Sequence, residues 1–240
     1  PSPPLGRHAD FMKLWVGQTI SWIGSALSRL AIPLIAALML DATPGEMGIL
    51  AAAGTTPALL FGLFAGVWVD RFQRRTLLIA GDIGRALLLI TIPVAALSGL
   101  LTIWQLYLIG FLNGILSVIV DVASRSYLPG VVEREQLVEA NGKLELSGSI
   151  TSIAGPSLAG LVIQAFTAPV AIIVDAVTYL ASAVSVLLIR HREDPPQKPG
   201  IPMLAQVRDG LKVVFHHPLL RAFAGCLGTS NFASNAFFAL

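Results

Sequence analysis

The chain of 240 residues is 55% hydrophobic and only 12% charged, with a formal net charge of +2 and a mean hydropathy of +0.75. An average soluble domain carries about 25% charged residues, so this composition excludes an ordinary soluble protein and indicates a polytopic membrane protein. The nearly balanced charge gives no sign of a nucleic-acid-binding surface, and the single cysteine, Cys226, excludes an internal disulfide.

The predicted elements are long apolar runs separated by Pro, Gly and charged residues. A helix needs about 20 predominantly apolar residues to span a bilayer, and each run reaches this length. In chain order, the complete spans are predicted at Phe11–Leu40, Glu46–Val69, Arg74–Leu97, Thr102–Tyr127, Val138–Phe166 and Pro169–Ile189. A seventh span begins near Leu219, and the chain ends inside it at Leu240. Because the chain also starts without Met, we expect it to be a fragment of a longer protein.

The Lys and Arg residues lie beside alternate connections between the spans. The connections 41–45, 98–101 and 167–168 contain neither Lys nor Arg. Cytoplasmic loops are enriched in these residues, so the pattern predicts that the N-terminus and every cation-bearing loop lie in the cytoplasm. The cations are Arg7, Lys13, Arg71, Arg74, Arg75, Arg134, Lys143, Arg190, Arg192 and Lys198.

One long connection, residues 191–217, follows the sixth span. Apolar residues from Met203 to Phe215 recur at helical spacing between polar ones, which predicts an amphipathic helix on the cytoplasmic membrane surface. A plain solvated linker is the alternative. We therefore predict a six-helix transmembrane bundle over residues 1–190, this linker over 191–217, and the start of a second, truncated bundle over 218–240.

A dense group of charges between the second and third spans is the most specific motif. The stretch Gly66-Val67-Trp68-Val69-Asp70-Arg71-Phe72-Gln73-Arg74-Arg75 resembles the loop signature of the major facilitator superfamily. The resemblance implies an all-α fold: the six-helix N-terminal half of a major facilitator protein, built as a 3+3 inverted repeat, plus a partial seventh helix.

The same resemblance implies a gating loop made of Gly66, Asp70, Arg71, Arg74 and Arg75. Asp70 would cap a helix in the other half of the protein, and the arginines would tie the loop to the fourth span. The alternative role for the arginines is orientation of the chain in the membrane.

Several charged residues lie well within the predicted spans. A charge near a helix centre costs about 2.5–3.5 kcal/mol on insertion scales, so these side chains should face protein or water. The residues are Arg29, Asp82, Arg85, Asp121, Arg125 and Asp175.

Their spacing suggests partners. Asp82 and Arg85 are expected to form a structural pair at i, i+3, and Asp121 and Arg125 to neutralise each other partly at i, i+4. Arg29 is expected to be held by a carboxylate from another span. Asp175 is the preferred partner and Asp121 the alternative; without such a pair, Arg29 should face the cavity and contact an anionic substrate.

Two spans carry a stripe of polar residues along one helix face. The stripes are Gln18, Trp22, Ser25 and Arg29 on the first span, and Asn113, Ser117, Asp121 and Arg125 on the fourth. In the superfamily that the loop resembles, these two helices line the central cavity, which implies a cavity-lining role for Gln18, Trp22, Ser25, Arg29, Asn113 and Ser117. Interhelical hydrogen bonding is the alternative for the serines.

The fifth span contains a second motif, Gly155-Pro156-Ser157-Leu158-Ala159-Gly160. It resembles the Gly-Pro-x-x-Gly-Gly motif of drug–proton antiporters at Gly155, Pro156 and Gly160. Ala159 departs from the pattern, and Thr151 stands where an upstream glycine is usual. Pro156 removes a backbone hydrogen bond, and the small residues permit close helix approach, so a generic packing motif is the alternative.

Several short sequence segments also resemble one branch of the superfamily. Leu14-Trp15-Val16-Gly17-Gln18, Leu128-Pro129 and Ala140-Asn141 are similar to the exporters that include enterobactin exporters and macrolide efflux proteins. This implies proton-coupled efflux of a small amphipathic drug, macrolide or siderophore by alternating access. It also implies a bacterial inner-membrane location and a monomer when full length.

Other functions are weighed beside efflux. A lysophospholipid transporter or flippase, a metabolite importer and a non-transport membrane scaffold are the alternatives. The sequence has no Gly-x-x-x-x-Gly-Lys loop, no reactive Ser/His/Asp or Cys/His set and no metal-ligand cluster. We therefore predict no enzyme activity, cofactor, metal or nucleic-acid partner; the expected partners are the lipid bilayer, a small-molecule substrate and protons.

Overall fold

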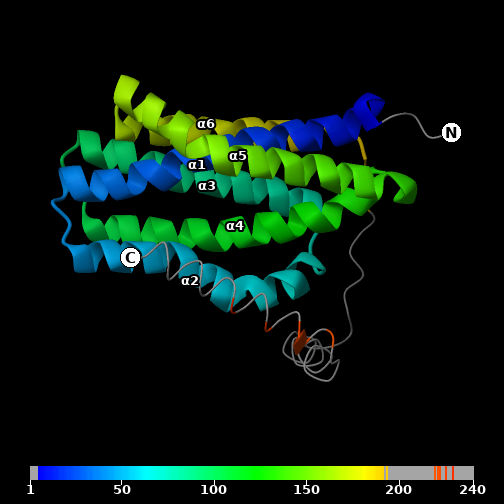
Figure 1. Ribbon diagram of the computed structural model, residues 1–240, viewed down its shortest axis with the longest axis horizontal. Coiled ribbons are helices and arrows are strands. Elements are labelled where there is room, and N and C mark those ends of the chain that lie inside the picture. The colour runs from blue at the N-terminus through cyan, green and yellow to red at the C-terminus, as the bar shows by residue number, and fades with distance from the viewer. Residues whose placement is uncertain are drawn as a thin grey trace. The chain divides into compact units, whose positions relative to one another are not determined.

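The computed structural model describes residues 5–191 and 193, together with the single positions 219, 221, 222, 225 and 229. Six long helices follow one another (Figure 1): α1 (Ala9–Met39), α2 (Pro44–Val69), α3 (Arg74–Leu97), α4 (Ile103–Val131), α5 (Leu137–Ala165) and α6 (Ala168–Leu187). Short 3-10 turns precede α1 at Leu5–Arg7 and α5 at Arg134–Gln136. All belong to one compact unit that extends to Pro196.

The six predicted spans are all helices, and their ends differ from the prediction by a few residues. The largest difference is at α4, which continues beyond Tyr127 to Val131. The predicted amphipathic linker helix lies outside the described residues. The five described positions in the predicted seventh span are helical.

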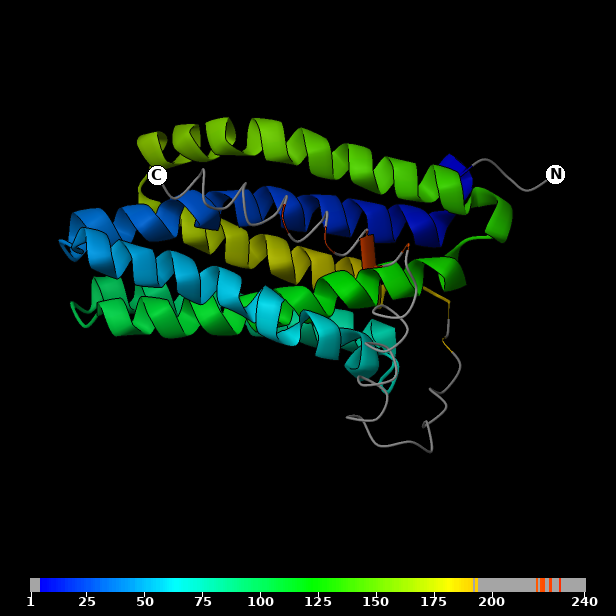
Figure 2. The same cartoon turned by 60° about the horizontal axis from the view of Figure 1, so that its bottom comes forward.

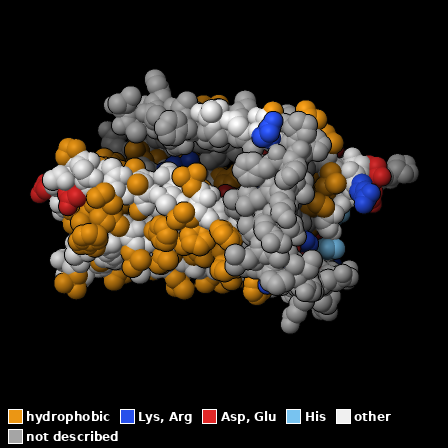
Figure 3. All heavy atoms as spheres, turned by 90° about the horizontal axis from the view of Figure 1, so that it is seen from below, with side chains coloured by type: hydrophobic (Ala, Val, Ile, Leu, Met, Phe, Trp, Pro, Cys, Tyr) orange, Lys and Arg blue, Asp and Glu red, His pale blue; other side chains and the backbone are white. Residues whose placement is uncertain are grey.

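Within the part of the chain that the structure describes, five helical segments are long and apolar enough to cross a membrane: α1, α3, α4, α6 and the segment Arg134–Ala165 that contains α5. Helix α2 has 26 residues and carries no charged residue from Met47 to Val69. Figure 3 shows hydrophobic side chains over the middle of one face and acidic side chains at its two ends. Exposed side chains such as Leu59 and Ile153 suit contact with lipid rather than water.

Local sequence signals account for several helix ends. Thr43 and Glu46 form a capping box at the start of α2, with Pro44 at the first position. At the start of α4, the Thr102 hydroxyl accepts a hydrogen bond from the Gln105 N–H. Between α3 and α4, Gly99 has φ +69°, a left-handed conformation that favours glycine.

The helices pack in a regular pattern of neighbours. Helix α1 lies against α5 and α6, α3 against α4 and α6, and α2 against α4. Helix α2 is the lowest helix of the bundle in Figure 1, and α5 is the uppermost helix in Figure 2. If the labels of α1 and α4, of α2 and α5, and of α3 and α6 are exchanged, the list of contacting helix pairs stays the same. The pattern therefore has the symmetry that a 3+3 repeat requires.

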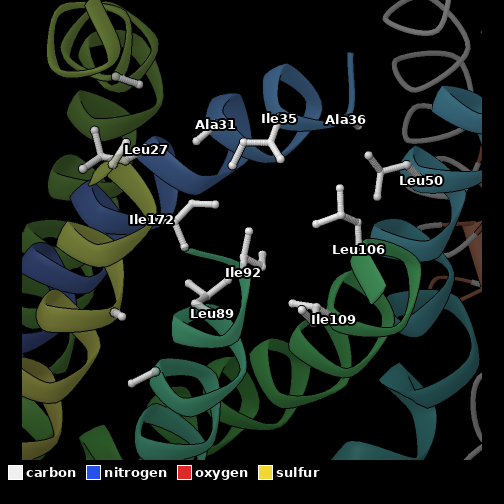
Figure 4. Close-up of a cluster of buried hydrophobic side chains, with 14 of the residues drawn as sticks. Leu27, Ala31, Ile35, Ala36, Leu50, Leu89, Ile92, Leu106, Ile109 and Ile172 are labelled. Atoms are coloured by element: carbon white, nitrogen blue, oxygen red, sulfur yellow. The ribbon is translucent and has the colours of Figure 1, made fainter. Parts of the chain in front are cut away.

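Two clusters of buried hydrophobic side chains fill the bundle, one toward each end. The first cluster lies toward the end of α1 (Figure 4) and includes Leu27, Ile35, Leu89, Ile92, Leu106 and Ile172. The second lies toward the start of α1 and includes Phe11, Leu14, Leu78, Tyr127, Leu128 and Ile189. Polar and charged residues occupy α1, α3, α4 and α6 between the two clusters, and these residues form the candidate site.

Candidate functional site

A layer of polar and charged side chains crosses the bundle near the middle of its helices. We call it the polar layer: Gln18, Ser21, Ser25, Asp82, Arg85, Ser117, Asp121, Asp175, Tyr179 and Ser182. Ionisable groups inside a membrane are costly and mark substrate, ion or proton pathways, so this layer is the candidate site. Among the described residues, no three His, Cys, Asp or Glu side chains are grouped to hold a metal ion.

The centre of the polar layer is the ion pair between Asp82 and Arg85 on α3. Both residues are buried, with exposed fractions of 2% and 4%. The Arg85 guanidinium carbon also lies 4.1 Å from the centre of the Tyr179 ring on α6, within the range of a cation–π contact. The expected i, i+3 pair therefore forms, and Tyr179 supports it from a second helix.

Tyr179 of α6 connects the polar layer to α1. Its hydroxyl and the Ser25 Oγ are 2.9 Å apart, and Ser25 Oγ also donates to the Ser21 carbonyl. Asp82, Arg85, Tyr179 and Ser25 thus form one chain of contacts through α3, α6 and α1. Sequence reasoning missed Tyr179. Its position one helical turn after Asp175 was the available signal, because i and i+4 share a helix face.

Asp175 of α6 is the most deeply buried carboxylate of the layer, with an exposed fraction of 0%. Its Oδ1 accepts a hydrogen bond of 3.2 Å from Thr178 Oγ1. Its Oδ2 has no hydrogen-bond partner of good geometry, although the Ser28 hydroxyl of α1 lies close enough to interact with the carboxylate. No Lys or Arg of the described chain lies within ion-pair distance of it.

The expected pair between Arg29 and Asp175 is therefore wrong. Arg29 is exposed and makes no hydrogen bond or ion pair with any described residue. Both residues lie well within their spans, but this position does not determine the direction in which a side chain leaves its helix. Asp175 points to the α1–α6 contact, whereas Arg29 borders a recess between α1 and α5.

Close approach of α1 and α6 depends on two glycines. An ideal Cβ on Gly24 would collide with Thr178 Oγ1 and lie 2.5 Å from Asp175 Oδ1. A Cβ on Gly17 would collide with Ser185 Oγ. Sequence reasoning missed both glycines. The signal was present as small residues at intervals of four and three along the first span: Gly17, Ser21, Gly24, Ser28 and Ala31.

The two predicted polar stripes do not each have a uniform environment. On α1, Gln18 is buried, Trp22 packs beside Gly148 of α5, Ser25 bonds to Tyr179, and Arg29 is exposed. On α4 the stripe becomes more exposed along its length. Asn113 and Ser117 are half-buried, whereas Asp121 and Arg125 are exposed.

Asp121 and Arg125 interact electrostatically, as the expected partial neutralisation requires, but they form no close ion pair. Arg125 instead lies 3.4 Å from Glu145 of α5, with both side chains largely exposed. Asp121 acts electrostatically on Arg85, which places it at the edge of the polar layer. An i, i+4 spacing permits a pair, but a carboxylate on a neighbouring helix competes for the same arginine.

The loop between α2 and α3 holds the predicted gating residues. Asp70 is the C-cap of α2 and lies 3.7 Å from Arg74. Arg74 also pairs with Glu193 at 2.9 Å, and Arg75 Nη2 donates to the Leu187 carbonyl at 2.7 Å. The described hydrogen bonds and close ion pairs of Arg74 and Arg75 thus run to Asp70, to Glu193 and to the end of α6, while Arg75 also interacts electrostatically with Tyr127 of α4. Helix α3 starts where α6 ends, and the last carbonyls of a helix attract cations.

The start of α1 holds the same exit segment after α6. Lys13 Nζ donates to the Leu188 carbonyl at 2.8 Å. The Asp10 carboxylate accepts hydrogen bonds from the backbone N–H groups of Arg190 and His191. Residues 188–191 and Glu193 are therefore held by the starts of α1 and α3. We call these contacts the exit clamp.

The antiporter-like motif shapes the contact between α5 and α1. A Cβ on Gly155 would lie 2.7 Å from the Ala26 Cβ, so glycine permits this approach. Beside it is a recess of about 240 Å³ lined by Ala26, Arg29, Leu30, Thr151, Ser152 and Pro156. No described residue lies within 4 Å of a Cβ built on Gly160 or on Gly66, so the described packing does not require glycine at either position.

Buried charges at mid-depth, a helix bundle with repeat-like neighbours and a charged loop at one end define the class as a polytopic membrane transporter. Residues 14–240 match the Major Facilitator Superfamily, and the chain belongs to this superfamily. The predicted all-α transporter fold is thereby confirmed.

Relatives with curated names point to one branch of the superfamily. The chain is 29% identical over 90% of its length to the uncharacterized MFS-type transporter YfiS of Bacillus subtilis, covering 52% of that protein. It is 27% identical over 75% of its length to macrolide efflux protein A of Streptococcus pyogenes, covering 44%. It is 26% identical over 66% of its length to the enterobactin exporter EntS of Salmonella typhimurium, covering 38%. The chain thus spans about half or less of these relatives, and the predicted resemblance to macrolide and enterobactin exporters is confirmed.

Proposed function

We propose that this chain forms the N-terminal half of a secondary active exporter. The exporter carries a small amphipathic compound out of the cell by alternating access. The observation that carries the proposal is the polar layer, where Asp82, Arg85 and Asp175 lie buried at mid-depth between two apolar clusters. Such charges are retained in membranes along transport pathways. The efflux named for its relatives supports the outward direction.

A proton gradient is the proposed driving force. A carboxyl group can take up and release a proton, whereas arginine stays charged. Asp175 is buried and has no ion-pair partner in the described chain. It is therefore the residue best placed to carry the proton. Arg85 already has Asp82 as its counter-ion, which leaves that pair a structural role.

Efflux by the full-length protein tests this function. Expression in a bacterium that lacks its main drug exporters should lower the accumulation of at least one compound in a panel containing macrolides and enterobactin. An ionophore that dissipates the proton gradient should abolish the difference. Asp70→Asn should reach the membrane at the same level but export several-fold less, because the family resemblance implies that Asp70 caps a helix in the other half and this capping carboxylate loses its charge. Accumulation that stays equal to the empty-vector control across the panel contradicts the proposal.

We further propose that the N-terminus and the loop between α2 and α3 lie in the cytoplasm of a bacterial inner membrane. Cysteine labelling in sealed cells checks this, in a Cys226→Ser background. Ser98→Cys should react with an impermeant maleimide from outside, and Gln73→Cys only after permeabilisation. Both positions are exposed, and Ser98 is preferable to Gly99 because of the positive φ at that glycine. External labelling of Gln73→Cys would reverse the orientation.

A further inference from the structure

We propose that the recess between α1 and α5 binds an anionic group of the transported compound, with Arg29 as its counter-ion. This inference rests on the proposed export function and names the chemical class of its substrate: an amphipathic molecule that bears a carboxylate, sulfonate or similar anion. The recess has a volume of about 240 Å³. That space fits the polar end of a small molecule, since whole drug-sized sites occupy about 300–1,000 Å³.

Of the three arginines within the predicted spans, Arg29 is the one without a contacting counter-ion among the described residues. Arg85 is matched by Asp82, and Arg125 by Glu145. Arg29 makes no ion pair or hydrogen bond in the described chain, and its electrostatic interaction with Asp175 acts without contact. Arginine cannot lose its proton, and a charge at this depth costs about 2.5–3.5 kcal/mol. A bound anion supplies the missing counter-charge.

The other walls of the recess fit the same ligand. The Thr151 hydroxyl forms no hydrogen bond with a described residue, so it is available to an anion. Pro156 has no N–H, which leaves the Ser152 carbonyl without its helical hydrogen bond and ready to accept from a ligand donor. Ala26 and Leu30 supply an apolar wall. One cation, polar groups and apolar carbon together suit an amphipathic anion rather than an inorganic one.

The depth of the recess in the membrane bears on whether its anion comes from a transported compound or from a lipid headgroup. Arg29 is about 30 Å along α1 from Ala9 and about 15 Å from Met39, at about 1.5 Å per residue. Thr151 is at the centre of α5, Leu137–Ala165. The hydrocarbon core is about 30 Å thick, so if α1 is centred in it, the Arg29 backbone lies about 7–8 Å inside its nearer boundary and Thr151 lies near its centre. This depth favours the anion of a transported compound, and competition by an anionic lipid distinguishes the headgroup source.

A matched pair of fluorescent probes tests the site in the purified full-length protein, held in nanodiscs of zwitterionic lipid. The anionic probe is 8-anilinonaphthalene-1-sulfonate, and its neutral counterpart is N-phenyl-1-naphthylamine. Arg29→Gln should weaken binding of the sulfonate at least about tenfold, which corresponds to about 1.4 kcal/mol, and change binding of the neutral probe less than twofold. Arg29→Lys should keep most of the sulfonate affinity. Thr151→Val should weaken it about threefold, and the control Arg125→Gln should leave it unchanged.

Each other outcome overturns the inference. Unchanged sulfonate binding in Arg29→Gln removes the site, and equal loss of both probes shows a structural role for Arg29. Competition by phosphatidylglycerol added to the nanodiscs assigns the site to a lipid headgroup. The binding test is independent of transport. If export depends on the proton gradient but Arg29→Gln leaves sulfonate binding unchanged, the inference fails and the proposed function stands. If no export is found but Arg29→Gln weakens sulfonate binding as expected, the proposed function fails and the binding site stands.

Discussion

Replacement of Arg85 by Ala should destabilise the full-length protein by about 3–5 kcal/mol, the largest loss that we expect from a single polar side chain. Arg85 and Asp82 are exposed by only 4% and 2%, so removal of the guanidinium leaves a carboxylate buried without a counter-ion. The ring of Tyr179 also loses its cation–π contact at 4.1 Å. Unfolding in mixed micelles, followed by circular dichroism, measures the free energy.

Two further variants distinguish the stability lost by breaking the buried pair from the stability lost by removing any arginine. Asp82→Asn/Arg85→Met removes both charges and should recover a large part of the lost stability, because no unpaired charge remains. Arg125→Ala removes an arginine whose side chain is 75% exposed beside Glu145, 68% exposed, and should cost about 0–1 kcal/mol. Equal losses for Arg85→Ala and Arg125→Ala would contradict the assignment of a buried pair.

Gly24→Ala should destabilise the protein by about 1–3 kcal/mol, although alanine is the better helix former. The added methyl would collide with Thr178 Oγ1 and lie 2.5 Å from Asp175 Oδ1. The Thr178 side chain can rotate, but the contact with Asp175 then requires α1 and α6 to move apart. The same displacement should reduce proton-coupled export, because it disturbs the proposed proton carrier.

Gly62→Ala on α2 is the matched control. No described residue lies within 4 Å of a Cβ at Gly62, so this change should be neutral or stabilising by up to about 1 kcal/mol. Adding Thr178→Ala to Gly24→Ala should restore part of the stability by removing the nearest atom. If Gly24→Ala and Gly62→Ala behave alike, the close approach at Gly24 is not important for stability.

The part of this structure that sequence could predict is the part determined within single helices. Apolar length located six helices, and an i, i+3 spacing was enough to place Asp82 beside Arg85, because helix geometry brings such residues together. Contacts between helices were not predictable in this way. The pairing of Arg125 with Glu145 and the separation of Arg29 from Asp175 depend on how each helix is rotated about its axis.

Two sequence features indicated how the helices are rotated about their axes, but both consist of small residues rather than polar ones. The small residues at intervals of four and three on α1, from Gly17 to Ala31, mark the face that meets α6. Gly155 marks the face of α5 that meets α1. A search for polar stripes passes over these faces because tight helix packing in membranes uses residues that have almost no side chain.

The exit clamp bears on how force could pass between the halves of the full-length protein. Lys13 and Asp10 hold residues 188–191, and Arg74 holds Glu193, so the backbone stays attached to the bundle for several residues after α6 ends. These contacts hold His191 and Glu193, at the start of the connection that we predict over residues 191–217, against the bundle. We expect tension along this connection to act on the first helical turns of α1 and α3, next to the Asp70 loop, and through Arg75 on the Leu187 carbonyl at the end of α6.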